Sequence, residues 1–101
     1  MMLTLNDIDT IENGEASQEE YYQAMQRAIN SGMAWKMQGS YGRAAMDAIS
    51  CGLCMLGRES CADYWGNPIP GRDDVKPGTK GSALFVKNES GKAWAAMIGA
   101  L

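Results

Sequence analysis

The run from Gln38 to Leu56 constrains the fold more than any other part of the chain, and it reads QGSYGRAAMDAISCGLCML. Ser40 can cap a helix here, because its hydroxyl can accept a hydrogen bond from a free backbone N–H of the first turn. Apolar residues then recur at helical spacing on one face: Ala45, Ile49, Leu53 and Leu56. Gly57 follows as the expected C-terminal stop. The pattern predicts a central helix over about 40–56, against which the rest of the chain packs.

Two helices are expected before this central helix. The segment Leu3–Asn13 carries leucine and isoleucine at three-residue spacing, with Thr4 or Asn6 as the cap. Ser17 and Glu20 have the spacing of a capping box, in which each side chain accepts from the other residue's backbone N–H. The helix that starts there is expected to end at the next Ser-Gly pair.

Two other segments lack a clear period. Residues 33–37 form either an extended connector or one helical turn that anchors Trp35 in the core. Residues 58–81 hold all three prolines and show no sustained periodicity, which predicts a long ordered loop. The residues expected to pin this loop to the core are Trp65, Ile69 and Val75.

The last segment is expected to be helical, with a break at Ser90–Gly91. A short strand at Ala83–Val86 is the alternative for its beginning. Taken together, the patterns predict a mainly α-helical single domain over residues 1–101. It is a compact bundle of four to five short helices around the central helix, with the long ordered loop crossing one face and a small β element left open.

Charge and composition restrict the function classes. The formal net charge of −3 argues against a dedicated DNA-coating protein. The first twenty residues contain acids but no lysine or arginine, which indicates either a binding face or first turns that complement helix dipoles. The chain shows no basic region followed by an apolar run, and no segment approaches the roughly 20 apolar residues of a membrane span. We therefore expect a reduced, cytoplasmic protein without membrane contact.

Three cysteines are the most suggestive candidates for metal or redox chemistry. Cys51 and Cys54 have the two-residue spacing of a zinc half-site, but zinc needs four ligands and the chain has no histidine. Cys61 with Asp47 or Asp63 could complete only an unusual site. The first two cysteines are expected near a helix C-terminus, where the dipole opposes a thiolate. We expect small buried side chains, and neither a metal nor a cofactor.

Enzymatic activity is not expected. The absence of histidine removes the commonest general base and the histidine-activated nucleophiles. Carboxylates are available, yet no two of them stand in a recognisable catalytic frame. No catalytic residue is therefore assigned, and binding functions remain.

Two expected helix starts have the composition of an anion site, since free backbone N–H groups there attract phosphate. The residues are Ser40 and Arg43 at the first start, and Lys76, Lys80 and Ser82 at the second. Neither start has the glycine spacing of a phosphate-binding loop. The alternative is structural: capping, close packing at Gly42, and an ion pair between Arg43 and Asp47. A binder of nucleic acid or of a small phosphorylated ligand is thus an alternative function, and nucleic acid is not favoured.

Aromatic residues and methionines are numerous for so small a core. Interface cores are enriched in aromatic residues, methionine and arginine. A domain of this size leaves part of this set exposed, which predicts a surface for a partner protein or for a second copy of the chain. The expected contact residues are Trp35, Tyr41, Arg43, Tyr64, Trp65 and Arg72.

Five short runs resemble small proteins of unknown function from tailed bacteriophages. The runs are Gly39–Ile49, Cys54–Gly57, Asp63–Asn67, Ile69–Pro70 and Val75–Ser82. The resemblance covers roughly the last two-thirds of the chain and assigns no active residue. It implies an origin in a phage or mobile element and action in the cytoplasm of a bacterial host. It also implies an accessory protein that binds and inhibits or redirects a host protein complex, anti-phage immunity included.

Overall fold

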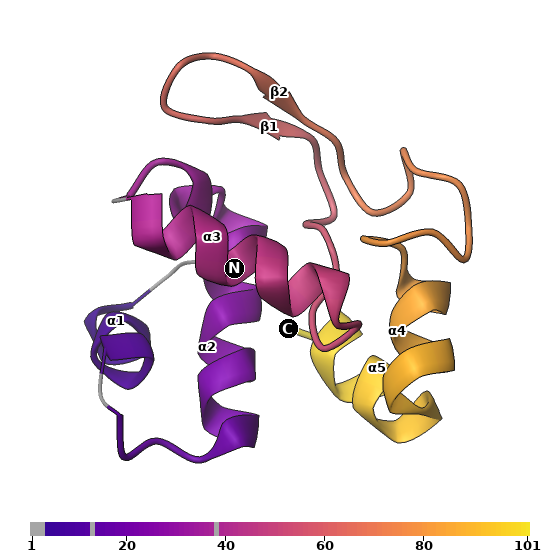
Figure 1. The fold of residues 1–101 in the computed structure, drawn as a ribbon, viewed down its shortest axis with the longest axis horizontal. Helices are drawn as coiled ribbons and strands as arrows, with labels where there is room; N and C mark the ends of the chain where they lie inside the picture. The colour runs from indigo at the N-terminus through magenta and orange to yellow at the C-terminus, as the bar shows by residue number, and fades with distance from the viewer. Residues whose placement is uncertain (1–3, 13, 38) are drawn as a thin grey trace.

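Five α-helices, one 3₁₀ helix and a short hairpin form the part of the chain that this computed structural model describes, residues 4–12, 14–37 and 39–101 (Figure 1). The elements are α1 (Leu5–Glu12), α2 (Gln18–Ser31), η1 (Met33–Trp35), α3 (Gly39–Ser50), β1 (Cys61–Ala62), β2 (Pro68–Ile69), α4 (Ala83–Ser90) and α5 (Lys92–Gly99). Strands β1 and β2 pair antiparallel, with Cys61 opposite Ile69. The predicted mainly α-helical fold with a small β element is confirmed.

Capping side chains set the starts of α1 and α2, as the sequence predicts. The Thr4 hydroxyl accepts from the Asp7 N–H at 3.1 Å, and the Asp7 carboxylate accepts from the Thr4 N–H at 3.1 Å. The predicted box between Ser17 and Glu20 is present in both directions. Leu3 and Asn13, the expected limits of the first helix, lie outside the described residues.

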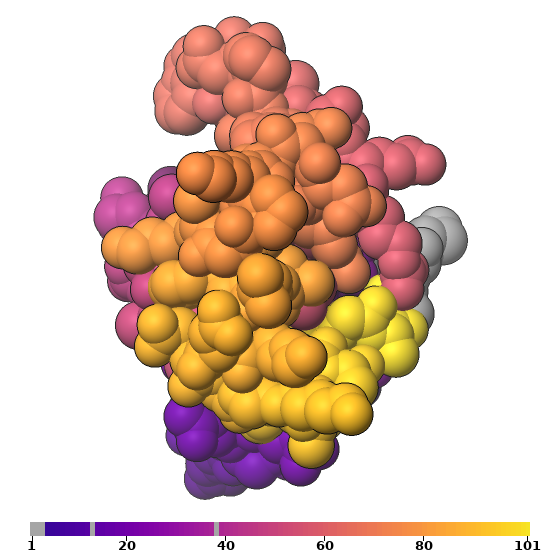
Figure 2. Space-filling view, turned by 90° about the vertical axis from the view of Figure 1, so that its right-hand side faces the viewer, coloured from indigo at the N-terminus to yellow at the C-terminus, as the bar shows by residue number. Residues whose placement is uncertain are grey.

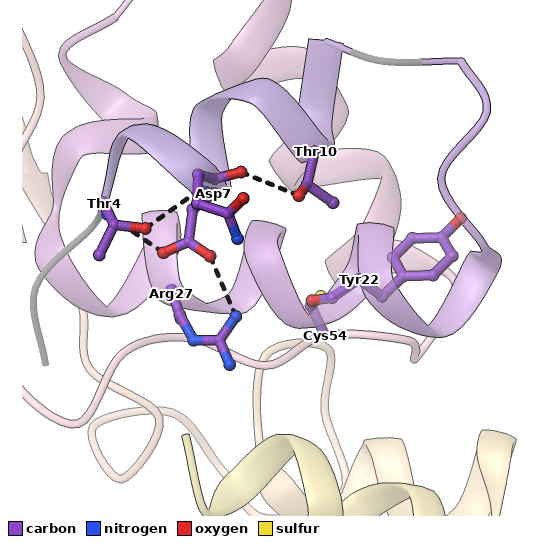
Figure 3. A network of polar contacts seen from close by, with 7 residues as sticks. Thr4, Asp7, Thr10, Tyr22, Arg27 and Cys54 are labelled. Carbon is purple, nitrogen blue, oxygen red and sulfur yellow. Dashed lines mark hydrogen bonds and ion pairs between the residues drawn. The ribbon is translucent and has the colours of Figure 1, made fainter.

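The cap of α1 also fastens this helix to α2. The Asp7 carboxylate accepts a hydrogen bond from the Arg27 guanidinium at 3.0 Å, as Figure 3 shows. Asp7 is 4% exposed, so the ion pair is largely shielded from solvent. A charge held this way is costly to leave without its partner. One side chain therefore both caps α1 and holds it in place.

The central helix is shorter than predicted, because α3 ends at Ser50. It begins at Gly39, so Ser40 lies inside its first turn and the predicted Ser40 cap is wrong. Gly52 adopts a left-handed φ of 74°. Its N–H binds the Ile49 carbonyl at 3.1 Å, and the Leu53 N–H binds the Ala48 carbonyl at 3.0 Å, which together form a Schellman termination. A Cβ on Gly52 would lie 2.5 Å from that of Glu89 in α4. Gly52, not Gly57, is thus the stop, and it lies where α4 comes close.

The chain beyond this stop runs through the interior without helical hydrogen bonds. Cys54, Met55 and Leu56 are buried there. The side-chain amide of Gln26 binds both backbone groups of Met55, at 2.8 and 2.9 Å. The Arg72 guanidinium donates to the Leu56 carbonyl at 2.8 Å. The Leu56 N–H donates to the Gly81 carbonyl at 3.0 Å. Side chains and backbone groups from distant segments therefore supply partners that a helix would have supplied.

Two apolar clusters hold the described elements together. The larger lies between α2, η1 and α3 and includes Met25, Ile29 and Trp35. The smaller joins Met55 to Val86 of α4 and Ile98 of α5. The 3₁₀ turn η1 thus anchors Trp35 in the core, which was one of the two alternatives for residues 33–37.

The β element lies inside the long loop and not at the start of the last segment. Residues 83–86 are helical because Ser82 caps α4, its hydroxyl accepting from the Phe85 N–H at 3.1 Å. Ile69 and Val75 pack against the larger cluster as predicted, but Trp65 is 80% exposed and does not pin the loop. The hairpin instead projects from one end of the molecule (Figures 1 and 2).

Candidate protein-binding groove

An open groove of about 830 Å³ lies between the projecting hairpin and the helical body. Its floor comes from η1 and the residues after it, one wall from the first half of α3, and the other wall from the hairpin turn. The large apolar side chains along it are Trp35, Met37, Met46, Tyr64, Trp65 and Ile69. Pockets of this size and character commonly take apolar groups.

The hairpin turn is held rigidly by one side chain. The Asp63 carboxylate accepts from the backbone N–H groups of Trp65 and Asn67, each at 2.9 Å, and from the Asn67 side-chain amide at 3.2 Å. These hydrogen bonds lower the pKa of Asp63, and the bond from the Asn67 backbone N–H has the largest effect. The Tyr64 N–H donates to the Trp35 carbonyl at 3.2 Å, which fastens the turn to η1. The turn is therefore preorganised without a bound partner.

Two aromatic rings stand on this turn in solvent. Tyr64 is 73% exposed and Trp65 is 80% exposed. Their rings meet edge to face, with centroids 5.3 Å apart. Exposure of two adjacent large aromatic side chains on a fixed backbone is unusual for a surface turn and is typical of interaction sites.

The opposite wall carries an exposed methionine and an exposed arginine. Met46 is 51% exposed. The Arg43 guanidinium lies over the first turn of α3, 3.2 Å from the position that a Cβ on Gly39 would take. Among the described residues no ion pair joins Arg43 to Asp47, so the ion pair of the structural alternative is wrong. Gly42 does pack closely, since its Cβ position lies 3.8 Å from the Ala34 carbonyl oxygen.

Three of the six predicted contact residues are buried. Trp35 is 9% exposed and forms part of the groove floor. Tyr41 donates a hydrogen bond to the Glu12 carboxylate. This bond is the main cause, and burial the second, that raises the pKa of Tyr41 to about 12. Arg72 binds the Leu56 carbonyl and the Asn30 side chain, and burial lowers its pKa. Tyr41 and Arg72 are scaffold, and only Arg43, Tyr64 and Trp65 are exposed.

The predicted anion-binding residues do not come together. Ser40 and Arg43 lie at the start of α3, on the left of Figure 1, whereas the loop that carries Lys76 and Lys80 lies on the right. Ser82 is 3% exposed. Its hydroxyl already accepts from the N–H groups of Gly78 and Phe85 and donates to the Thr79 carbonyl. The two predicted helix starts are therefore separate, and Ser82 at the second start is already used within the fold.

The cysteines are free thiols in three different surroundings. Cys54 is buried, and burial raises its pKa to about 12. Cys61 is half-buried against the larger cluster. Cys51 is exposed, so the expectation that all three are buried is wrong for Cys51. Within the described ranges, no three cysteine or acidic side chains are grouped in a way that could hold a metal ion.

Sequence reasoning missed several groove residues. The residues missed are Lys36, Met37 and Met46, and the only feature used was the excess of methionine in the composition. The spacing of Met46 from Arg43 could have found one of them, because it places both residues on one face of a helix.

Across the described residues, no helix has the length and apolarity to cross a bilayer.

Comparison with known proteins places the chain in a family. No curated protein and no solved structure matches it. The family of the domain of unknown function DUF7417 matches residues 2–63, which include α1 to α3, β1 and the first residue of the hairpin turn. The match confirms an uncharacterised family and does not indicate a phage origin. The chain belongs to the DUF7417 family.

Proposed function

We propose that this protein is a non-enzymatic binding module that holds a partner protein in the groove between α3 and the hairpin. The observation that carries the proposal is the pair Tyr64 and Trp65, largely exposed on a turn that Asp63 fixes. Aromatic residues dominate the binding energy of protein interfaces, and a rigid turn loses little entropy when it binds.

The groove supplies the second half of such an interface. Met46 lines the groove on α3, and Met37 lines it beside Trp35 in the floor. Methionine adapts its shape to an incoming side chain, because it is unbranched and its thioether is polarisable. An apolar side chain of a partner would therefore be enclosed by aromatic groups on one side and by adaptable groups on the other.

The resemblance noted in the sequence suggests the biological setting. We take the protein to be a phage-type accessory factor, and its partner to be a protein of the bacterial host that it inhibits or redirects. A cytoplasmic site of action follows from that setting. A second copy of the chain is the competing occupant of the groove.

Capture from a bacterial lysate tests the proposal. The tagged wild type is compared with the double variant Tyr64→Ser/Trp65→Ser, and the captured proteins are identified by mass spectrometry. The matched control is Leu5→Ser/Leu84→Ser, which removes two exposed apolar side chains outside the groove, 85% and 43% exposed. The mass of the free protein in solution is measured for all three.

The expected result is a protein captured by the wild type and by the control, and lost with the hairpin variant. Placing a photo-crosslinking side chain at Met46 should then join that protein to the groove. Equal capture by the hairpin variant, or no capture at all, would refute the proposal. If the wild type and the control are dimers in solution and the hairpin variant is a monomer, the partner is a second copy of the chain.

A further inference from the structure

One end of the groove is electropositive. The backbone N–H groups of Gly39, Ser40 and Tyr41 begin α3, where a helix offers them no internal acceptor. No described residue accepts from them. The helix dipole adds positive potential at the same place. The guanidinium of Arg43 lies over this turn, against Gly39.

The charges along the groove do not cancel at that end. Lys36 and Arg43 are both exposed, and neither forms an ion pair within the described ranges. The Asp63 carboxylate keeps its negative charge, but its three hydrogen bonds hold it on the hairpin turn, on the wall opposite α3. Asp47 lies a full turn further along α3, away from Gly39. The end near Gly39 therefore attracts an anion.

The indole N–H of Trp35, in the groove floor, forms no hydrogen bond with a described residue. Trp35 is 91% buried. Every buried side-chain nitrogen and oxygen in the described part has a partner, so this N–H must reach solvent. Buried tryptophans usually satisfy that N–H. An acceptor on an occupant of the groove would take the place of solvent at this N–H.

We propose that the groove binds a protein segment in which a carboxylate side chain stands next to a large apolar side chain. The carboxylate binds the Arg43 guanidinium at the start of α3, and a backbone carbonyl of the segment accepts from the Trp35 indole. The apolar side chain lies between Met46 and Trp65. This inference rests on the proposed function and names the chemistry of the partner.

Charge complementarity is the reason to choose this occupant over a purely apolar one. A charge-assisted hydrogen bond from arginine to a carboxylate is stronger than a neutral one and is directional. A nucleic acid is less suitable, because the groove walls are mainly apolar and its cations number only Lys36 and Arg43.

Selection from a library of random displayed peptides tests the inference on the intact protein. Peptides enriched on the wild type are sequenced, and the tightest one is synthesised together with a version in which each acid is replaced by its amide. Binding of both peptides is measured for the wild type and for Arg43→Gln. The control variant Lys80→Gln removes the same charge from an exposed side chain outside the groove.

The enriched peptides should share an acid beside a bulky apolar residue. Replacing that acid should weaken binding to the wild type about tenfold or more, as expected for a lost charge-assisted bond. Arg43→Gln should lose the same factor and should no longer distinguish the two peptides, whereas Lys80→Gln should behave as wild type.

Enriched peptides without an acid, or an acid whose effect persists in Arg43→Gln, would overturn the inference. If such peptides still fail to bind the variant Tyr64→Ser/Trp65→Ser, the groove remains a protein-binding site and only the chemistry of its partner is wrong. If the wild type enriches no peptide more than the variant Tyr64→Ser/Trp65→Ser does, the inference is overturned. The lysate experiment alone then decides the proposed function.

Discussion

Gln26 of α2 supports the interior segment after α3 in the way that a neighbouring strand would. Its Oε1 accepts from the Met55 N–H at 2.8 Å, and its Nε2 donates to the Met55 carbonyl at 2.9 Å. Both residues are 0% exposed. The substitution Gln26→Leu introduces an apolar side chain one bond shorter and removes both bonds. It leaves two backbone groups buried without partners.

The expected loss of stability follows from these two groups. Each buried backbone group left unpaired costs about 1–3 kcal/mol, so the pair costs about 2–6 kcal/mol. Exchanging the amide for two methyl groups returns about 1 kcal/mol of apolar burial. The variant also loses the bond from Gln26 Nε2 to Asn30 Oδ1 at 3.0 Å, but this oxygen still accepts from Arg72 at 3.1 Å. We expect a net loss of about 2–4 kcal/mol, a large part of the stability of a small domain.

Urea-induced unfolding measures this loss, followed by tryptophan fluorescence and by far-ultraviolet circular dichroism. The slope m should stay constant while the midpoint falls. The control is Gln23→Leu on the same helix. Within the described part of the chain, the Gln23 amide binds the Met97 thioether sulfur at 3.2 Å and no backbone group. Its expected effect is below about 1 kcal/mol, since sulfur is a weak acceptor.

The substitution Gln26→Glu separates hydrogen bonding from packing. An ionised carboxylate can accept from the Met55 N–H but cannot donate to the Met55 carbonyl, whereas the protonated acid can do both. Burial raises the pKa of the new carboxyl, so its stability deficit should shrink as pH falls toward about 4. Equal losses for Gln26→Leu and Gln23→Leu, or no recovery of the glutamate variant in acid, would refute the reasoning.

Three further perturbations test other parts of the fold. In urea unfolding, Gly52→Ala should cost about 1 kcal/mol or more of stability beyond the cost of Gly66→Ala. Both glycines have a positive φ, but of the two only Gly52 would bring its new Cβ against Glu89 of α4. Equal losses would contradict the close approach of α4. The raised pKa of Tyr41 means that its stabilising contribution is complete below pH 10 and is lost as pH rises through about 12. Glu12→Ala should therefore lower the last tyrosinate step in an absorbance titration, and an unchanged step would argue against the bond. Asp7→Ala should weaken the cap and the ion pair of α1 by about 1–3 kcal/mol and speed amide exchange there; unchanged exchange would show that apolar contacts alone hold this helix.

Much of the helical pattern was predictable because its signals are local. The Ser17 capping box and the break at Ser90–Gly91 depend only on side chains a few residues apart. Such contacts form in the same way whatever the rest of the chain does. The end of α3 was predicted wrongly, at Gly57 and not at Gly52. Contacts with α2 and α4 favour the earlier one.

The groove was predictable only in part. Arg43, Tyr64 and Trp65 were expected contact residues and are exposed, but Trp35 and Tyr41 have the same chemistry and are buried. Composition cannot tell these two groups apart, since large aromatic side chains suit both a core and an interface.

The sequence by itself determined where most helices begin and end, because caps and glycine stops act between near neighbours. Only the tertiary structure decided which aromatic rings face solvent. A bond from the Tyr64 N–H to the Trp35 carbonyl places the hairpin beside η1, and Tyr41 is buried because Glu12 of α1 reaches it. These contacts join residues that are far apart in the chain, so no local pattern encodes them.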